Sequence, residues 1–351
     1  MLAKWIYQPC PGISAVHRNA ALARQGQLTK PAGSLGRLER LAIELAGLQQ
    51  TERPRARRVP IIIFAGDHGV VVQGVSAYPQ EVTIAMMSNF AAGGAAISVL
   101  ARQLGSRLEV VDAGTLAQSP VPGIVTDKPR NGSRDFSKEA ALEPSEVAFA
   151  LECGKRAVLR AVREAPDLLI LGEMGIGNTT SSAAIAAALL GISAEEIAGS
   201  GTGIDAAGRA RKARVIDEAL ARHGLTRGGV AVENVLSAVG GLEIVAISGA
   251  IIAAAQNRLP VLLDGFIVSV AALAAVRLNP SCRPFVLASH QSAERGHRLV
   301  LGALDIAPLI DLDLRLGEGS GAAVALPLLR LACTLHNEMA TFEQANVPGA
   351  H

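Results

Sequence analysis

The sequence is poor in aromatic residues, which make up only 3% of its 351 positions. Half of the chain is nevertheless hydrophobic, and Ala, Leu, Val and Ile carry most of that apolar content. Small and branched aliphatic side chains suit helices that pack on a buried parallel sheet. The length supports one large α/β domain with a smaller appended unit, or two modest domains.

The sequence also lacks an excess of charge of either sign. It has 33 Lys and Arg against 31 Asp and Glu, which gives a net charge of +2. This balance indicates no nucleic-acid partner and no membrane surface. The one basic cluster, residues 53–58, precedes an apolar run and is interpreted as a solvated loop.

Cysteines and long apolar runs are scarce as well. The four cysteines have no metal-ligand spacing, and a chain of this length needs no disulfides, so we expect free thiols in a reducing compartment. No secretory pattern opens the sequence. The most apolar region, 242–276, is interrupted by charged residues and Pro260, which argues against a membrane-spanning helix. We therefore expect a cytoplasmic protein.

Short apolar runs alternate with helical patterns along the chain. This alternation predicts an α/β fold with a doubly wound, mostly parallel sheet flanked by helices. Polar residues or glycines follow the expected strands, and the carboxyl ends of such strands form the ligand crevice. We therefore expect a single site at these ends. The expected strands are 59–65, 108–112, 168–171, 260–263 and 285–288.

The two ends of the chain are predicted to form a small helical subdomain. Leucines recur at helical spacing over 35–48, and no convincing strand lies before residue 50. Residues 1–55 are therefore expected to form a helical arm that packs with 335–351. Residues 56–334 would then form the large α/β catalytic domain, with one helix over 80–104.

The most informative stretch is 167–189, in which an apolar run, a glycine-rich turn and an alanine-rich helix follow one another. Glycines let the backbone approach a ligand closely, while Asn178 and the threonines after it can cap the helix or bond an anion. The helix dipole and free N–H groups favour a negative ligand. The spacing fits neither a dinucleotide nor a triphosphate motif. We expect a monophosphate site, with an ordinary strand-to-helix turn as the alternative.

Eight short motifs follow one another over nearly the whole chain. They are KPAGSLGRLE at 30–39, GDHGV at 66–70, GVSAYP at 74–79, NFAAGGAAI at 89–97, GEMGIGNTTSSAA at 172–184, LDGFI at 263–267, SHQSAE at 289–294 and LDLRLGEGSGAA at 312–323. Together they resemble the nicotinate-nucleotide–dimethylbenzimidazole phosphoribosyltransferases. GEMGIGNTT and LGEGSGA form the most specific pair.

The resemblance implies an activity and a set of substrates. The family transfers the phosphoribosyl group of nicotinate mononucleotide to 5,6-dimethylbenzimidazole, giving α-ribazole 5′-phosphate and nicotinate for the lower ligand of cobalamin. Nicotinate leaves as a neutral ring nitrogen, whereas the acceptor must lose a proton, so a carboxylate base is the group most needed. The reaction uses no cofactor and needs no bound metal. Dimethylbenzimidazole, adenine and phenolic bases all remain open as the preferred acceptor.

The resemblance also implies roles for individual residues. Glu318 resembles the family's general base, with Leu316 in the apolar wall that would raise its pKa, and Glu173 is a supporting carboxylate. Taken alone, Glu318 could be a helix N-terminal acid and Glu173 a loop charge. The expected phosphate-binding residues are Gly175, Gly177, Asn178, Thr179 and Thr180, with Gly201, Gly203 and Lys212 at the same end. Asp264 and Ser292 are expected at the ribose, and Ser76, Tyr78, Met86 and Met87 at the acceptor slot.

Other functions have to be weighed against the same residues. His68 and His290 lack the neighbours of a metal site and are expected to cap or line the crevice. A dehydrogenase would need Gly-x-Gly-x-x-Gly after an early strand, and a non-catalytic nucleotide-binding module would not need Glu318. No Ser–His or Cys–His pairing is evident, which favours a single displacement with inversion. The family resemblance implies a homodimer, in which 86–97 is either a contact or a buried helix.

Overall fold

The computed structural model describes residues 2–201, 203–226 and 229–348. A six-stranded, fully parallel sheet in the order β3-β2-β1-β4-β5-β6 lies at its centre. The order reverses between β1 and β4, the point at which doubly wound sheets open a crevice. The predicted fold class is therefore confirmed. The strands are β1 (Ile61–Gly66), β2 (Leu108–Gly114), β3 (Val125–Thr126), β4 (Leu169–Met174), β5 (Val261–Leu263) and β6 (Val286–Ala288).

The central strand β1 separates two hydrophobic cores. All six of its residues are buried, and successive side chains point to opposite faces of the sheet. Ile62 and Phe64 join one cluster of apolar side chains, whereas Ile61 and Ile63 join the other. A run that is apolar at every position therefore fits a strand covered on both sides.

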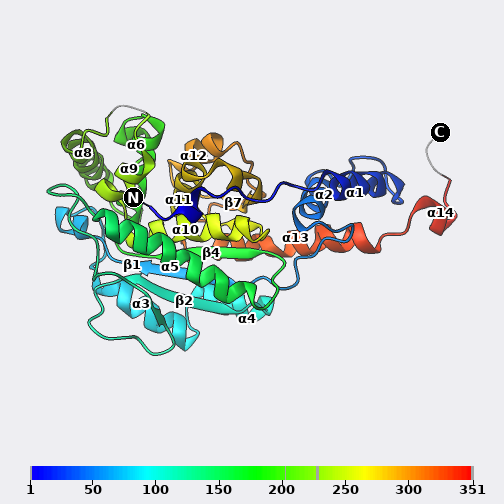
Figure 1. The fold of residues 1–351 in the computed structure, drawn as a ribbon, viewed down its shortest axis with the longest axis horizontal. Coiled ribbons are helices and arrows are strands. Elements are labelled where there is room, and N and C mark those ends of the chain that lie inside the picture. The colour runs from blue at the N-terminus through cyan, green and yellow to red at the C-terminus, as the bar shows by residue number, and fades with distance from the viewer. Residues whose placement is uncertain (1, 202, 227–228, 349–351) are drawn as a thin grey trace.

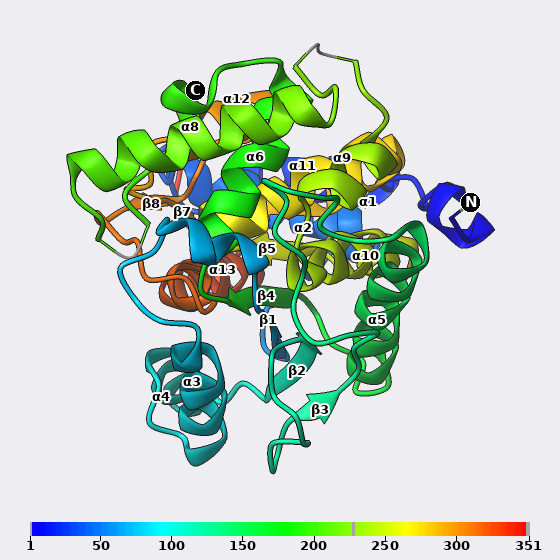
Figure 2. The same ribbon diagram turned by 90° about the vertical axis from the view of Figure 1, so that its left-hand side faces the viewer.

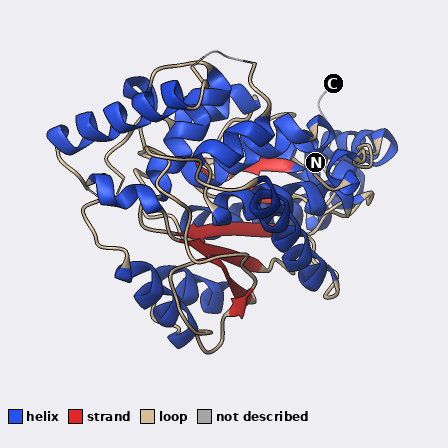
Figure 3. Cartoon of the chain, turned by 60° about the vertical axis from the view of Figure 1, so that its left-hand side comes forward, coloured by secondary structure: helices blue, strands red, loops and turns tan. Residues whose placement is uncertain are grey.

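Helices cover both faces of this sheet, and Figure 3 shows the strands enclosed between them. On one face lie α5 (Pro144–Val162), α10 (Leu242–Gln256) and α11 (Phe266–Leu278). A side chain at Gly154 of α5 would meet the backbone of α10, which explains why these two helices can pack so closely. On the other face, α4 (Ala96–Leu104) and α13 (Ser320–Glu338) supply the second core.

The remaining elements surround this core, and Figure 2 shows α6, α8 and α12 on the opposite side of the sheet region from α3 and α4. A short second sheet pairs β7 with β8. The bounds are α3 (Glu81–Ala92), α6 (Asn178–Leu190), α7 (Ala194–Ile197), α8 (Ala206–Arg222), α9 (Val232–Val239), α12 (His297–Leu304), α14 (Phe342–Ala345), β7 (His290–Gln291), β8 (Ile310–Asp311), and 3-10 turns at Lys4–Tyr7, Gly69–Gln73 and Pro280–Phe285.

The first helices project from one end of the molecule beside the last part of α13 (Figure 1). These helices are α1 (Ala15–Gln27) and α2 (Arg37–Gln49). Arg24 of α1 donates to the carbonyl of His336 over 2.7 Å, and the amide of Gln25 lies 2.9 Å from Nδ1 of the same histidine. The division into a subdomain of 1–55 with 335–351 and a catalytic domain of 56–334 stays a proposal, and residues 349–351 lie outside the described chain.

The prediction of one helix over 80–104 was wrong. By length and mean hydropathy, 1.6, the stretch Glu81–Leu104 resembles a membrane span, but it forms two helices of 12 and 9 residues. Gly93 ends α3 in the left-handed conformation, at a φ of 82°, with its N–H bonded back to the last turn. Since a span needs about 20 residues, neither helix is long enough to cross a bilayer.

Two further expectations need correction. The turn predicted to begin at Gly172 begins later, because β4 continues through Gly172 and Glu173 to Met174. Residues 114–142, whose content of Gly, Pro, Ser and Asn predicts an irregular region without an interpretable motif, contain the edge strand β3, where Val125 pairs with Val111 of β2.

Candidate active site

A cavity of 440 Å³ opens at the carboxyl ends of β4 and β5, beside the point where the strand order reverses. Segments that are far apart in sequence form its wall. They are the start of α3, the strand–turn–helix around β4, the start of α11, the chain after β6, and the turn before α13. Its lining residues include Tyr78, Val82, Met86, Glu173, Gly175, Asn178, Thr179, Gly201, Phe266, Ile267, His290, Ser292, Glu294, Arg315, Leu316, Gly317 and Glu318.

Glu318 is presented to this cavity by an unusual turn. Gly317, Glu318 and Gly319 adopt φ values of 86°, 63° and 81°, and the left-handed conformation is costly for a residue with a side chain. The carboxylate of Asp264 stabilises the turn, because it accepts the N–H groups of Gly319 and Ala322 over 3.0 and 3.1 Å.

The same turn passes directly over β4 at Gly172. A Cβ atom on Gly172 would lie 2.5 Å from the backbone nitrogen of Gly319 and 2.6 Å from the carbonyl carbon of Glu318. Only glycine fits here. Gly172, which we expected in the glycine-rich turn, therefore lies in β4 and leaves room for the Glu318 turn to pack against the strand.

The Glu318 carboxyl is well placed to take up a proton. The residue is 6% exposed, and its Oε2 has no hydrogen-bond partner within the described residues. Burial raises the pKa of Glu318, a hydrogen bond from the backbone of Ile97 lowers it, and the charge of Asp264 raises it again, with a net upward shift. Such shifts are common in catalytic acids and bases. Leu316, expected in an apolar wall, does line the cavity but is 59% exposed.

Glu173 lies at the end of β4 and, like Glu318, lines the cavity. Burial raises its pKa to about 8, helped by the negative charges of Asp264, Glu243 and Glu318. Glu173 is therefore largely protonated at neutral pH when no ligand is bound. Asn178, which we predicted to contact phosphate, donates its side-chain amide to Glu173.

Around Thr179 and Gly201, which line the cavity, the structure gathers donors suited to an anion. Lys212 of α8 is 1% exposed, and its Nζ donates to Oγ1 of Thr179 over 3.0 Å, in the first turn of α6. Burial lowers the pKa of Lys212 to about 8, against the attraction of Glu294. Gly201 packs against both groups, since a Cβ there would lie 3.1 Å from the Lys212 nitrogen. The amino end of α6 adds the positive end of its dipole.

The other predicted site residues divide into two groups. Ser292, Tyr78 and Met86 line the cavity, whereas Met87 is buried in the core with Ala65 and Ala117. Asp264 lies beneath the cavity, where its carboxylate holds α13, so of the two predicted ribose contacts only Ser292 borders the space. The predicted residues that the structure does not place in the wall are Gly177, Thr180, Gly203, Lys212, Asp264 and Ser76, and their ligand contacts stay predictions.

Several lining residues were not predicted. His290 was expected to line the crevice and does so. Glu294 and Arg315 were missed, although they lie within the motifs SHQSAE and LDLRLGEGSGAA, and the first two residues after Gly265 were missed within LDGFI. Among the described residues, no group of three or more His, Cys, Asp or Glu side chains is arranged to hold a metal ion.

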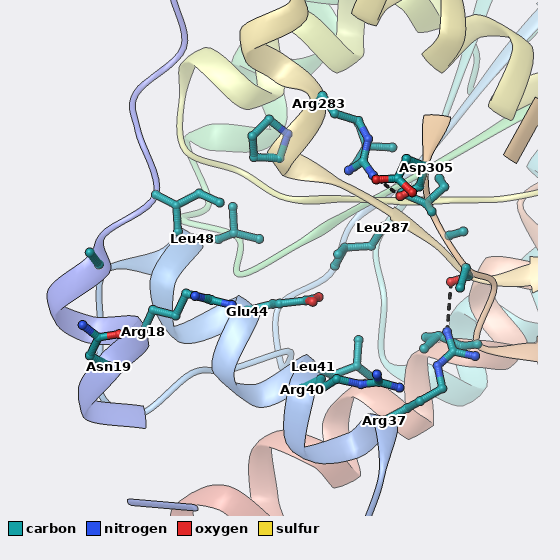
Figure 4. A pocket seen from close by; sticks show the side chains of 18 residues that line it. Arg18, Asn19, Arg37, Arg40, Leu41, Glu44, Leu48, Arg283, Leu287 and Asp305 are labelled. Carbon is teal, nitrogen blue, oxygen red and sulfur yellow. Dashed lines mark hydrogen bonds between the residues drawn. The ribbon is translucent and has the colours of Figure 1, made fainter. Parts of the chain in front are cut away.

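A second, larger cleft of 640 Å³, called the arm cleft below, lies between helices α1 and α2 and residues 283–309, and Figure 4 shows its arginines with Glu44 and Asp305. Arg37 donates to the carbonyls of Pro308 and Ala307, and Arg283 to those of Leu304 and Asp305. Arg18 and Arg40 also line this cleft. Because none of the predicted site residues borders it, the cavity at the strand ends is the candidate active site.

Comparison with known proteins gives a consistent picture. A family model described as Phosphoribosyltransferase matches residues 10–347. The nicotinate-nucleotide–dimethylbenzimidazole phosphoribosyltransferase of Bradyrhizobium diazoefficiens is 76% identical over 348 residues, 99% of each chain. The protein of the same name from Pseudomonas putida KT2440 is 53% identical over 99% of each chain. The crystal structure of CobT from Thermus thermophilus matches with a TM-score of 0.91 and 44% identity, over 95% of this chain and 100% of that one.

Proposed function

This chain belongs to the nicotinate-nucleotide–dimethylbenzimidazole phosphoribosyltransferases, and we propose that its cavity at the strand ends carries out their reaction. The enzyme transfers the phosphoribosyl group of nicotinate mononucleotide to 5,6-dimethylbenzimidazole, for the lower ligand of cobalamin. The observation that carries the proposal is Glu318, a buried carboxylate with an unpartnered oxygen, in the same cavity as an anion-binding end.

We propose that Glu318 is the general base of a single displacement. One ring nitrogen of the acceptor attacks the anomeric carbon, and the bond from that carbon to the pyridinium nitrogen breaks with its electron pair going to nicotinate. The proton on the second acceptor nitrogen passes to the Glu318 carboxylate. Because attack and departure occur on opposite faces, the β-linked nucleotide gives an α-linked product.

The two ends of the cavity suit the two substrates. Thr179, Gly201 and Lys212 would bind the phosphate, and the anion would favour the charged form of Lys212 by direct attraction. Tyr78, Val82 and Met86 offer apolar surface on the α3 side, where the flat acceptor base would lie within reach of Glu318. In this proposal the ribose would lie between the phosphate-binding residues and the two carboxyl groups.

Product analysis tests this function directly. Purified protein is mixed with nicotinate mononucleotide and dimethylbenzimidazole, and chromatography follows nicotinate and the new ribotide, with NMR to assign the anomer. We expect equal amounts of nicotinate and an α-linked ribotide. Binding of the nucleotide without nicotinate release, with every azole, purine or phenol tried as acceptor, would leave the anion site standing and remove the enzymatic assignment.

We also propose a homodimer located in the cytoplasm. Met87, Phe90 and Ile97 are buried within their own chain, so a contact through 86–97 would have to use the small residues between them. Solution scattering at micromolar concentration should give twice the mass of the chain, and a monomer mass would refute the dimer. Fractionation of cells into cytoplasmic and membrane fractions tests the location.

A further inference from the structure

Outside the wall of the candidate active site, a hydrogen-bonded pair of side chains lies buried against glycine backbone. Nε2 of His68, the second residue after β1, lies 2.7 Å from Oε1 of Glu243 in the first turn of α10. The side chains are 1% and 0% exposed. Neither residue lines the cavity, and the reaction proposed above uses neither of them.

Glycines from three parts of the chain surround this pair. A Cβ atom added at Gly66 or Gly241 would come closer than 3.0 Å to an atom of the pair. At Gly177 it would lie 3.0 Å from Cβ of His68, and at Gly175 it would lie 3.4 Å from Oε1 of Glu243. Gly175 and Gly177 belong to the turn that leads into α6, so the backbone of this turn rests on the pair.

The pair also reaches the α3 wall of the cavity. The side-chain amide of Gln80 donates to the carbonyl of His68 over 2.8 Å, and Gln80 is the residue immediately before α3. His68 therefore contacts the anion-binding turn through Gly177 and the acceptor wall through Gln80. The contact with Gly177 is made by the side chain of His68, and the contact with Gln80 is made by its backbone carbonyl.

We propose that His68 and Glu243 are positioning residues, which hold the turn at 175–177 in the geometry that receives the phosphate of the nucleotide. This inference rests on the proposed function, because the phosphate is that of the proposed donor substrate. The pair acts through the backbone of the turn and touches no substrate.

The charge of Glu243 gives the pair a second, measurable influence. Glu173 is faced by Asp264 after β5, Glu243 of α10 and Glu318 before α13, and these three charges, added to burial, raise its pKa. Asn178 opposes the shift through its hydrogen bond. Removal of the Glu243 charge should therefore lower the pKa of Glu173 and move the pH dependence that this residue controls toward lower pH.

Two variants of Glu243 separate position from charge. Glu243→Gln keeps the length of the side chain but removes its charge, so we expect the alkaline part of the pH profile of kcat/KM to shift downward. Glu243→Asp keeps the charge but cannot reach His68 as closely, so we expect the KM for nicotinate mononucleotide to rise by about tenfold or more with the wild-type pH profile. The KM for the acceptor should change less than twofold in Glu243→Asp.

A matched control removes a buried pair from the arm. Lys30 and Glu39 lie 2.8 Å apart with side chains 5% and 11% exposed, so Glu39→Gln, like Glu243→Gln, replaces a buried glutamate that is paired with a basic side chain. It should lower thermal stability and leave KM and the pH profile unchanged. If Glu243→Asp yields no folded protein, His68→Asn, whose amide stops short of Glu243, provides the same KM test.

The outcomes are distinct. Wild-type KM in Glu243→Asp together with a wild-type pH profile in Glu243→Gln would overturn the positioning role, as would an equal KM increase in Glu39→Gln. If the wild-type protein shows no turnover, the proposed function fails first. Calorimetric titration with nicotinate mononucleotide then still tests the pair, since loss of binding in Glu243→Asp but not in Glu39→Gln supports it.

Discussion

The two concave regions of this protein differ in how they hold their charged side chains. At the strand ends, Glu173 and Glu318 are both 6% exposed and lie on backbone that neighbouring glycines fix in place. In the arm cleft, Arg18 and Arg40 are exposed. Arg37 of α2 donates to the carbonyl of Ala307, beyond α12, whereas Arg283 donates to that of Asp305, directly after α12. The smaller cavity, 440 Å³ against 640 Å³, is the one that we propose as the active site.

The two regions differ in how far they exclude water from their charged side chains. A carboxyl group shifts its pKa strongly only where water is excluded, and a reacting group needs a fixed position more than it needs space. The strand ends supply both conditions, because backbone rather than flexible side chains forms the floor under Glu318. In the arm cleft, by contrast, Arg18 and Arg40 are exposed to solvent, and Arg37 links α2 to the chain after α12.

The largest loss of activity is expected from a substitution at Gly172. Gly172→Ala forces the Glu318 turn away from β4, because the new Cβ would meet backbone atoms at 2.5 and 2.6 Å. A displacement of about 1 Å can cost roughly a hundredfold in rate, so we expect kcat to fall by about that factor. Gly26→Ala, at a position on α1 with open space around it, should keep full activity and raise stability by up to about 1 kcal/mol. Steady-state kinetics and thermal melts measure both.

Replacement of one cationic side chain in each region gives the next comparison. Lys212→Met removes the charge nearest Thr179, and the loss of a charged hydrogen bond worth about 1.5–3 kcal/mol predicts a KM for nicotinate mononucleotide raised roughly 10- to 100-fold. Arg40→Met in the arm cleft should change it less than twofold. Initial rates over a range of nucleotide concentrations give the KM of each variant. Equal effects of the two substitutions would mean that the arm cleft also binds the nucleotide.

The pH dependence of stability should differ in sign between the two regions. Glu173 has its pKa raised from 4.5 to about 8, so its contribution is fully present below pH 4.5 and is lost as pH rises toward 8. Burial opposes ionisation of Glu39, but Lys30 and backbone N–H groups lower its pKa overall, so its contribution is lost as pH falls below about 4.5. Denaturant unfolding of Glu173→Gln and Glu39→Gln from about pH 2 to 9 measures both.

In those experiments, Glu173→Gln should remove the decline in stability that wild type shows between pH 4.5 and 8. Glu39→Gln should leave that decline in place and flatten the acid side instead. A wild-type profile in Glu173→Gln would mean that this carboxyl titrates at its ordinary pKa in the folded protein.

Local sequence patterns predict much of the site, whereas the rest depends on contacts between segments that are far apart in the chain. The strand ends and the helix after Gly177 were predictable because apolar runs and glycines encode them locally. The break between α3 and α4 was missed although Gly93 and Gly94 signal it, because the apolar pattern continues on both sides. The left-handed conformation of Glu318 could not be predicted, since it depends on Asp264, more than fifty residues away in the chain. The arm cleft depends on how α2 lies beside β6, which no local pattern encodes.

The most direct test of the central claim compares binding and turnover in Glu318→Gln. Calorimetry measures nicotinate mononucleotide binding, and nicotinate release is assayed on the same preparation with dimethylbenzimidazole present. If Glu318 is the base, the dissociation constant should stay within about threefold of wild type while turnover falls by at least about a hundredfold. Turnover close to that of wild type would show that another group takes the acceptor proton, and it would contradict the account of this site.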